Sequence, residues 1–366
     1  MLSKVPPREQ SNRRPRHDSH PDLSLDASRR MPVIPVLQSV ARAARLDLLA
    51  RVANRRRLLI VTYHGIRDDA SPARSWLLLP LSEFERQVEF LGAHYDVLPV
   101  DAALAETESG RPRACITFDD GYRNNLELAL PVLQRLQLPA TIYLPTAFIG
   151  SKDLLWTTRL DFALRRVDDP TRSLFADWAS ASRAENGDVP AHRISDALKQ
   201  MAPAKRDEVL MRIFSHVPEP SGEEAAPHAF LSWEEVGAME ATGLVTFGAH
   251  TVNHEIVRNL DDLSLRRELA DSLAVVRKRC ARPSSVFAYP NGRDIDFDDR
   301  AARILEELRC IAAVSTIEGL NDSSTPRYAL RRISVGGDMG FAEFRSRVSG
   351  LDSQARRLVK EGARGG

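Results

Sequence analysis

The 366-residue chain has a formal net charge of +1, which argues against a general polyanion binder, so we expect no nucleic-acid partner. Its hydrophobic fraction of 43% and charged fraction of 28% are ordinary for a soluble globular protein. Three isolated cysteines without metal-binding spacing fit a reducing compartment better than a disulfide framework. We find neither the ~20 consecutive apolar residues that span a bilayer nor a secretory signal, and the expected location is therefore cytoplasmic.

Residues 1–57 are expected to form a basic segment that precedes the compact domain. The stretch up to about residue 30 is rich in Arg, Pro, Ser and His and lacks periodic apolar positions, which predicts disorder. Over residues 36–52, apolar side chains recur at helical spacing with arginines elsewhere on the wheel. This basic amphipathic helix could make a peripheral contact with anionic lipid, or it could pack on the domain, which we favour.

The compact domain is expected to span residues 58–346, followed by a flexible tail over residues 347–366. Residues 58–63 form a continuous apolar run, typical of a strand buried on both faces, which ends at His64. Strand and helix patterns then alternate, which indicates a parallel sheet whose active groups gather at the carboxyl ends of the strands. Over residues 151–230 helical patterns replace this alternation, so we expect a helical insertion there.

Two of the Ser-x-x-Glu sequences of the chain stand directly before helical patterns and predict where helices begin. In such a capping box, the serine side chain accepts a hydrogen bond from a first-turn N–H and the glutamate reaches back to the serine N–H. The pattern occurs at Ser82 and Glu85, and again at Ser232 and Glu235. We expect one helix to begin at each serine.

Residues 114–122 have the pattern of a buried strand that runs into two adjacent carboxylates, Asp119 and Asp120, and a glycine. Neighbouring side chains at a strand end point apart, so the two carboxylates can serve different partners. One could bind a metal while the other takes a proton from water. Taken alone, the stretch could equally be an Asp-Gly turn that closes a hairpin.

Two histidines, His250 and His254, stand four residues apart where another buried strand ends. On a helical turn such residues share a face, so both rings could reach one cation. With one aspartate they make a set of three ligands and an open position, which is typical of a catalytic zinc or related divalent site. A hairpin turn needs no such histidines, so the set favours the metal interpretation of the Asp pair.

These motifs resemble those of the polysaccharide deacetylases, the NodB-homology proteins of carbohydrate esterase family 4. Residues 116–121 and 250–254 are similar to the first two motifs of the family, and residues 287–292 resemble the third in its Tyr-Pro-x-Gly form. Residues 63–65 are similar to the Tyr-His opening of one branch. The resemblance covers roughly residues 58–335 and implies an α/β fold, a distorted (β/α) barrel with fewer than eight strands.

The resemblance implies a metal-dependent hydrolase that removes N-acetyl groups from amino sugars of a polysaccharide or glycoconjugate. In this interpretation Asp119 is the general base toward the attacking water, and Asp120 binds the metal together with His250 and His254. The expected ion is Zn²⁺. The family pattern assigns the backbone N–H of Asn291 to the tetrahedral oxyanion, a kind of contact often worth ~3 kcal/mol.

Further candidates come from the surroundings of these motifs. Tyr289 and Tyr122 are candidates for contact with the substrate, although Tyr122 could equally be a packing residue. Many family members carry a C-terminal histidine as general acid, but this chain has no histidine after His254. The candidate acid is therefore His64, which could alternatively be a core histidine bonded to a backbone carbonyl.

Two positions depart from the family pattern. The third motif usually carries an arginine that orients the catalytic aspartate, and Ala288 occupies that position here. Arg331 or Arg332, near the end of a late strand, could supply the guanidinium instead. Glu255 stands where the family usually has proline, which changes the loop but removes no ligand.

Two other functions are compatible with the sequence. The same site could act on a small formamide, a cyclic imide or an O-acetyl ester, because attack by water works on each of these carbonyls. A non-catalytic glycan-binding module is the second alternative, which the intact metal and base set disfavours.

Overall fold

The structure, a computed structural model, describes residues 46–351 except 74, 106–109, 183 and 185–188. Its main strands are β1 (Leu58–Tyr63), β5 (Arg113–Phe118), β6 (Ala140–Leu144), β7 (Val245–Ala249), β8 (Val286–Ala288), β9 (Ala312–Glu318) and β10 (Leu330–Ser334). They form one parallel path in the order β7-β6-β5-β1-β10-β9-β8. A two-residue strand, β4 (Asp96–Val97), pairs with β5 outside this path.

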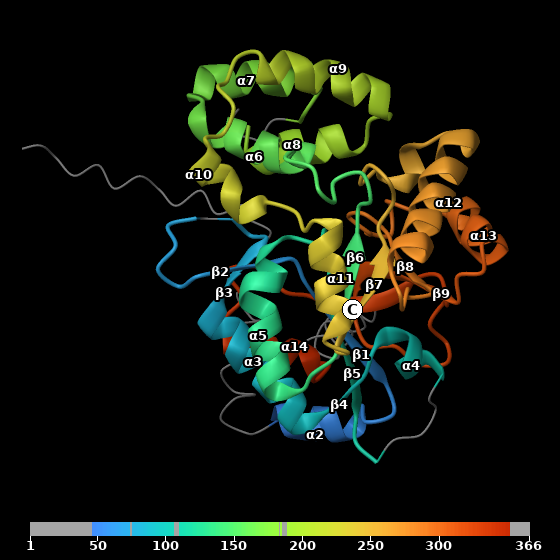
Figure 1. The fold of residues 1–366 in the computed structure, drawn as a ribbon. Helices are drawn as coiled ribbons and strands as arrows, with labels where there is room; N and C mark the ends of the chain where they lie inside the picture. Colours follow the sequence, from blue (N-terminus) through green and yellow to red (C-terminus); the bar gives the residue numbers. More distant parts are fainter. Residues whose placement is uncertain (1–45, 74, 106–109, 183, 185–188, 352–366) are drawn as a thin grey trace, which may run out of the picture.

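The two ends of the path, β7 and β8, lie beside each other, so that the sheet is nearly closed (Figure 1). One parallel bridge joins Phe247 of β7 to Pro283, just before β8. At the same seam the Ser284 N–H donates to the Phe247 carbonyl at 2.7 Å. The expected distorted (β/α) barrel, with fewer than eight strands in its wall, is confirmed.

Strand β1 shows why these strands appear in the sequence as continuous apolar runs. Leu58 and Ile60 belong to a cluster that fills the barrel with side chains from β5, β6, β8 and β9. Leu59 and Val61 pack in the larger cluster between the sheet and the surrounding helices. All six residues of β1 are buried because both faces of the strand are covered. The sequence therefore shows no alternation of apolar and polar residues.

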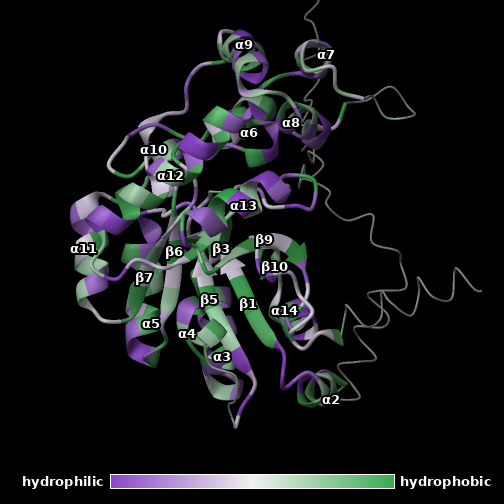
Figure 2. Ribbon diagram, turned by 90° about the vertical axis from the view of Figure 1, so that its right-hand side faces the viewer, coloured by the Kyte–Doolittle hydropathy of each residue, from purple (hydrophilic) through white to green (hydrophobic). Residues whose placement is uncertain are grey.

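Helices surround the barrel wall, with alternating hydrophilic and hydrophobic residues where the strands are mainly hydrophobic (Figure 2). They are α2 (Leu46–Ala53), α3 (Leu81–His94), α4 (Val100–Ala105), α5 (Leu130–Leu136), α11 (Trp233–Ala241), α12 (Asp262–Arg279), α13 (Asp299–Glu307) and α14 (Phe341–Val348). A small separate sheet pairs β2 (Gly65–Arg67) with β3 (Leu78–Pro80). Three short helical turns complete this part of the fold: η1 (Asn125–Ala129), η2 (Ala226–His228) and η3 (Val257–Asn259).

Only one of the two expected capping boxes is present. Ser232 accepts from the Glu235 N–H at 3.2 Å and Glu235 accepts from the Ser232 N–H at 2.7 Å, which confirms the start of α11. The prediction for Ser82 is wrong, because α3 begins at Leu81 with Pro80 as its N-cap and has no side-chain cap. The Ser82 hydroxyl donates instead to Asp69, from the loop between β2 and β3, at 2.9 Å.

Five helices lie together at one end of the barrel (Figure 1). They are α6 (Trp156–Arg166), α7 (Asp169–Trp178), α8 (Ala191–Lys199), α9 (Pro203–Phe214) and α10 (Gly222–Ala225). The first four share an apolar cluster that is separate from the barrel core. The chain enters and leaves this helical lobe side by side, since the Gly150 N–H donates to the Leu231 carbonyl at 2.8 Å. The Leu231 N–H in turn donates to the carbonyl of Gly121, which directly follows the Asp pair, at 2.9 Å.

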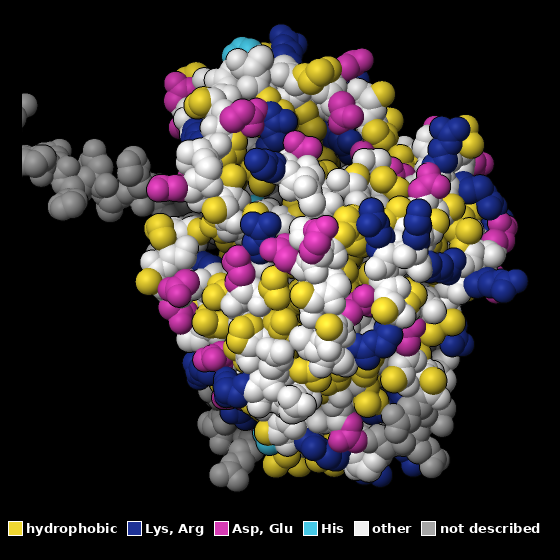
Figure 3. Space-filling model, viewed as in Figure 1, with side chains coloured by type: hydrophobic (Ala, Val, Ile, Leu, Met, Phe, Trp, Pro, Cys, Tyr) yellow, Lys and Arg dark blue, Asp and Glu magenta, His cyan; other side chains and the backbone are white. Residues whose placement is uncertain are grey.

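Helix α2 is the described end of the expected basic N-terminal helix. Leu49 and Val52 are exposed on it, whereas the Arg51 guanidinium lies 5.3 Å from the centre of the Phe90 ring. The predicted disorder up to about residue 30 and most of the predicted tail lie outside the described residues, and the lipid contact stays a prediction. Among the described residues, no helix combines the length and apolar character that a membrane crossing requires. Basic and acidic side chains are interspersed over the face in Figure 3.

Candidate active site

The Asp pair follows β5 directly, at a sharp turn of the chain. The Asp119 N–H continues the sheet by donating to the Tyr63 carbonyl at 3.0 Å. The next two residues then adopt left-handed backbone, with φ of 72° at Asp120 and 66° at Gly121. A Cβ at Gly121 would lie 2.5 Å from a methyl carbon of Leu144, so only glycine fits this close approach. The turn therefore separates the two carboxylates, as the strand-end position predicts.

Asp119 forms a buried two-pronged ion pair with Arg332. The guanidinium nitrogens donate to Oδ1 at 2.8 Å and to Oδ2 at 2.7 Å, and both side chains are almost inaccessible. Burial by itself raises the pKa of Asp119, but the charge and hydrogen bonds of Arg332 outweigh it and hold the pKa below its ordinary value. Asp119 is therefore ionised at neutral pH.

Three contacts fix the Arg332 side chain inside the barrel. It donates to the Ser315 carbonyl at 2.7 Å and to the Thr62 hydroxyl at 3.0 Å, in addition to Asp119. Its neighbour Arg331 is exposed and donates to the carbonyl of Glu318. Of the two arginines that the sequence offered, only Arg332 reaches the aspartate.

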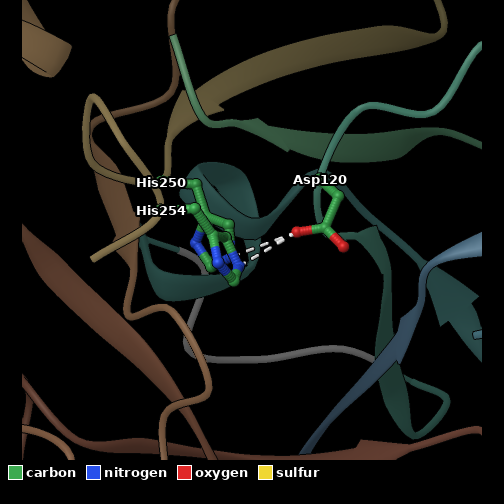
Figure 4. Close-up of side chains that lie close together, drawn as sticks. All are labelled: Asp120, His250 and His254. Carbon is green, nitrogen blue, oxygen red and sulfur yellow. Dashed lines mark ion pairs between the residues drawn. The ribbon is translucent and has the colours of Figure 1, made fainter. Parts of the chain in front are cut away.

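Asp120 faces the two histidines that follow β7. Its Oδ1 lies 3.2 Å from Nε2 of His254 and 3.7 Å from Nε2 of His250 (Figure 4). Among the described residues these three form a group whose ligand atoms all lie within 4.8 Å of one another. The hairpin interpretation of the Asp pair is therefore wrong, since parallel strands flank the turn and the histidines converge on it.

The donor set fits a divalent cation. The Nδ1–H of His250 donates to the Ala288 carbonyl at 2.8 Å, which leaves the lone pair on Nε2 directed toward Asp120. Burial lowers the pKa of His250 to about 4, so the ring is neutral at pH 7. Asp120 Oδ1 is buried without a hydrogen-bond partner among the described residues. A lone pair on Nε2 of His250 that faces an ionised oxygen favours a cation between them.

Asp120 stays ionised in spite of its burial. Burial raises its pKa, but the nearby rings of His254, His64 and His250 together hold the pKa below its ordinary value. An ionised carboxylate and neutral imidazoles are the protonation states that a divalent metal requires of its ligands.

The loop that carries the histidines is held in an unusual backbone conformation. Thr251 and His254 have φ of 62° and 57°, values that cost energy for residues with a side chain. The buried carboxylate of Glu268, from α12, accepts from the Val252 N–H at 2.8 Å and the Asn253 N–H at 2.9 Å. The second histidine is thus presented from a backbone that its surroundings fix.

Asn291 lies on the loop after β8, also with left-handed backbone at φ 61°. Its side chain donates to Asp296 at 2.5 Å, and its carbonyl accepts from the Thr316 hydroxyl at 2.7 Å. Its backbone N–H has no protein acceptor among the described residues. This N–H is therefore free to donate to a ligand, and its contact with the oxyanion stays a prediction.

His64 follows β1 and is half-buried beside the Asp pair. Burial lowers its pKa, while the charges of Asp120 and Asp119 oppose that shift. Its Nδ1 has no hydrogen-bond partner among the described residues, and the ring lies 5.2 Å from Trp76 in an edge-on arrangement. In the described part of the chain no hydrogen bond joins the His64 ring to a backbone carbonyl, so the alternative of a carbonyl-bonded core histidine is not observed there.

The two tyrosines do not line a cleft. Tyr122 is fully buried and stacks on Phe230 at 5.4 Å between ring centres. Tyr289 is also fully buried, with its ring stacked 4.4 Å from that of Phe297. The expected substrate contacts of Tyr122 and Tyr289 are therefore replaced by packing behind the site, because the apolar rings fill the space between strands and loops.

Two supporting residues escaped the sequence analysis. Glu268 was part of a helical pattern, yet it stands three residues after Leu265 and one before Leu269, on the buried face of α12. A carboxylate on an apolar face is a signal for a buried partner. Thr62, which binds Arg332, gave no such signal, because threonine is common within strands.

A parallel barrel that gathers an ionised carboxylate and an Asp-His-His set at its strand ends has the parts of a hydrolase that activates water. The family model for polysaccharide deacetylases matches residues 106–311, more than half of the chain, so the protein belongs to the polysaccharide deacetylase family. It is accordingly an enzyme that acts on carbon–nitrogen bonds other than peptide bonds in acetylated polysaccharides.

Known proteins agree with this assignment. YxkH of Bacillus subtilis (strain 168), which carries a provisional description as a polysaccharide deacetylase, is 21% identical over 300 residues that cover 81% of this chain and 77% of YxkH. The solved Streptococcus pyogenes deacetylase PplD, in complex with acetate, is similar in fold, with a TM-score of 0.53 and 20% identity over 80% of this chain and 98% of PplD. IcaB from Ammonifex degensii has a TM-score of 0.51 and 15% identity over 80% of this chain and 97% of IcaB.

Proposed function

We propose that the protein is a metal-dependent N-deacetylase that releases acetate from N-acetylated amino sugars of a polysaccharide or glycoconjugate. The observation that carries this proposal is that two adjacent carboxylates on one turn have different partners. Asp119 is paired with Arg332, whereas Asp120 faces two histidines with a buried oxygen that has no hydrogen-bond partner in the described part of the chain.

Asp120, His250 and His254 would hold the ion, for which we propose Zn²⁺ because two imidazoles and one carboxylate are a zinc-type donor set. Such an ion, when bound, polarises a substrate carbonyl and makes water a stronger nucleophile. The neutral His250 ring and the ionised Asp120 need no change of protonation to bind it.

Asp119 acts as the general base in this proposal. Its ionised carboxylate accepts the proton of the attacking water, and the two bonds from Arg332 keep it in one orientation. The guanidinium stays charged throughout, so it positions Asp119 without taking the proton itself.

Two further groups complete the reaction. The Asn291 N–H donates to the oxygen that becomes negative when water adds to the acetyl carbonyl. His64 in its protonated form donates a proton to the leaving amine nitrogen, so that the carbon–nitrogen bond breaks to give acetate and a free amino sugar. The free Nδ1 of His64 and its position beside both carboxylates support this role.

The test is acetate release from N-acetylglucosamine oligomers by the purified protein. We expect activity that a chelator abolishes and Zn²⁺ restores, and loss of activity in Asp119→Asn with unchanged metal content. Full activity in Asp119→Asn would exclude Asp119 as the base. A side-by-side panel of a formamide, a cyclic imide and an O-acetyl sugar identifies the acyl group, and faster turnover of any of these would replace the N-acetyl assignment.

A further inference from the structure

A buried ion pair joins the helical lobe to the histidine loop. Arg206 of α9 donates to Glu255 at 2.6 Å and 2.8 Å, one bond to each carboxylate oxygen. Only 5% of the Arg206 side chain and 13% of the Glu255 side chain are exposed. The guanidinium also contacts Asp207 at 2.9 Å and lies 5.0 Å from the centre of the Trp156 ring. Both partners are therefore fixed in one geometry.

Glu255 directly follows His254, whose ring lacks the support that His250 has. The Nδ1–H of His250 is held by the Ala288 carbonyl. Among the described residues, the His254 ring has no hydrogen-bonding or ionic partner except Asp120. The direction in which His254 points is therefore set mainly by its backbone, which is left-handed at φ 57°.

Contacts from two sides hold the backbone of the loop that carries His254. Glu268 of α12 holds the N–H groups of Val252 and Asn253 from the barrel side. Arg206 holds Glu255 from the lobe side, and the Glu255 N–H closes the loop by donating to the Thr251 hydroxyl at 3.1 Å. The contact of Glu268 ends before His254, and the next barrel contact comes only where Val257 packs in the barrel core and the Arg258 N–H donates to the Asp296 carbonyl at 3.1 Å. Between these two points, Glu255, the residue directly after His254, is held by the lobe.

We propose that the Arg206–Glu255 pair is a positioning device through which the helical lobe holds His254 in place as a metal ligand. The inference rests on the proposed function, because it takes Asp120, His250 and His254 as the ligand set. A second contact supports the coupling: the side chain of Asn259 donates to the Lys199 carbonyl of the lobe at 2.7 Å. The lobe is thus part of the metal site's support and not only a cover.

The test measures the Zn²⁺ dissociation constant by competition with a chelator, and the visible absorption spectrum of the Co²⁺ form. We expect Glu255→Gln and Arg206→Gln each to weaken Zn²⁺ binding about tenfold to a hundredfold, the usual effect of removing support behind a ligand. The Co²⁺ spectrum should change in both variants. The double variant should bind Zn²⁺ no more weakly than the single variant with the lower Zn²⁺ affinity, because both substitutions break the same contact.

The matched control is Glu318→Gln, which removes the carboxylate of another partly buried Arg–Glu pair, with Arg347 at 2.8 Å, outside the histidine loop. This variant should bind Zn²⁺ as the wild type does. A purely structural pair would lower the melting temperature of the metal-free protein and leave the Zn²⁺ affinity unchanged. Affinity within twofold of the wild type in both single variants overturns the proposal, as does an equal loss in Glu318→Gln or effects that multiply in the double variant.

Failure of the proposed function has a different signature. In that case the wild type itself binds Zn²⁺ no better than Asp120→Asn does. Should a neutral variant fail to fold, Arg206→Lys keeps the charge but loses the two-pronged contact, and it carries the same expectation of weaker Zn²⁺ binding.

Discussion

Asp119 and Asp120 are adjacent carboxylates that would raise each other's pKa if they shared one environment. The left-handed turn at Asp120 sends them to different partners. Arg332 neutralises the first, and the two histidines surround the second. Each residue thus owes its charge state to a group that arrives from a distant part of the chain.

Replacing Arg332 by lysine tests the support of the base. Arg332→Lys keeps a positive charge but offers a single ammonium in place of two parallel N–H bonds, so Asp119 loses its fixed orientation. We expect kcat to fall about tenfold to a hundredfold while the Zn²⁺ content stays that of the wild type. Arg331→Lys, on the exposed neighbour, is the control and should retain full activity. An unchanged kcat in Arg332→Lys would show that Asp119 does not need two hydrogen bonds from a guanidinium.

Replacing His64 tests the general acid through the pH–rate profile. The protonated ring is the active form, so wild-type kcat/KM should fall as the pH rises through its pKa. Because burial lowers the pKa of His64, that decline should lie below the range of an ordinary histidine. In His64→Gln we expect kcat to drop about 100-fold or more and this alkaline limb to disappear.

The control for His64→Gln is His216→Gln, which removes an exposed histidine of the lobe. It should keep the wild-type profile. An alkaline limb that persists unchanged in His64→Gln would assign the acid to another group.

The parts of the site that lie in short contiguous motifs were predictable, and the parts that depend on packing were not. Asp119, Asp120 and both histidines belong to such motifs. The sequence narrowed the partner of Asp119 only to Arg331 or Arg332. Burial does not alternate regularly along strand β10, and its register with β9 shifts between Leu330 and Arg332. Which of two adjacent arginines turns inward is decided by that register.

At the scale of single elements, the same Ser-x-x-Glu pattern has different outcomes at two positions. Both Ser-x-x-Glu patterns have the residues of a capping box, but only Ser232 caps a helix. At Ser82 the N-cap of α3 is Pro80, two residues earlier, and the serine hydroxyl donates to Asp69 instead. A local sequence pattern indicates a possible cap, but whether the cap forms depends on other hydrogen-bond partners that the fold brings to the same side chain.

This contrast gives a paired stability prediction. Ser232→Ala removes an N-cap and should lower the free energy of unfolding by about 1 kcal/mol. Ser82→Ala removes only an exposed side-chain contact, and its effect should stay within about 0.5 kcal/mol. Urea denaturation of both variants measures the difference. Equal losses would mean that the capping geometry at α11 contributes nothing specific.

At the scale of the whole molecule, the alternation of strand and helix was enough to predict a parallel sheet, because apolar runs buried on both faces are typical of such sheets. The barrel was implied by the resemblance to the polysaccharide deacetylases. The separate core of the lobe could not be predicted. Its helices are amphipathic like those around the barrel. Nothing in their sequence indicates that Leu164 and Leu198 pack in a common cluster of the lobe and not against a strand of the barrel. Only the three-dimensional arrangement separates the two cores.

Metal removal should act on the entire fold. An ion that binds the folded chain and not the unfolded one stabilises it by about 2.7 kcal/mol at a free concentration one hundred times its dissociation constant. We therefore expect Zn²⁺ to raise the melting temperature, a chelator to reverse the rise, and Asp120→Asn to remove most of it. A melting temperature indifferent to Zn²⁺ in the wild type would contradict the metal assignment.

The narrow neck of the helical lobe has a consequence for the evolution of this chain. Gly150 and Leu231 are joined by one backbone hydrogen bond, so about eighty residues leave the barrel and return to almost the same point. A segment attached in this way can change in length without opening the sheet, provided that the contacts of Arg206 with Glu255 and of Lys199 with Asn259 are kept. Sequence variation in the lobe is therefore constrained at these contacts by the candidate metal site.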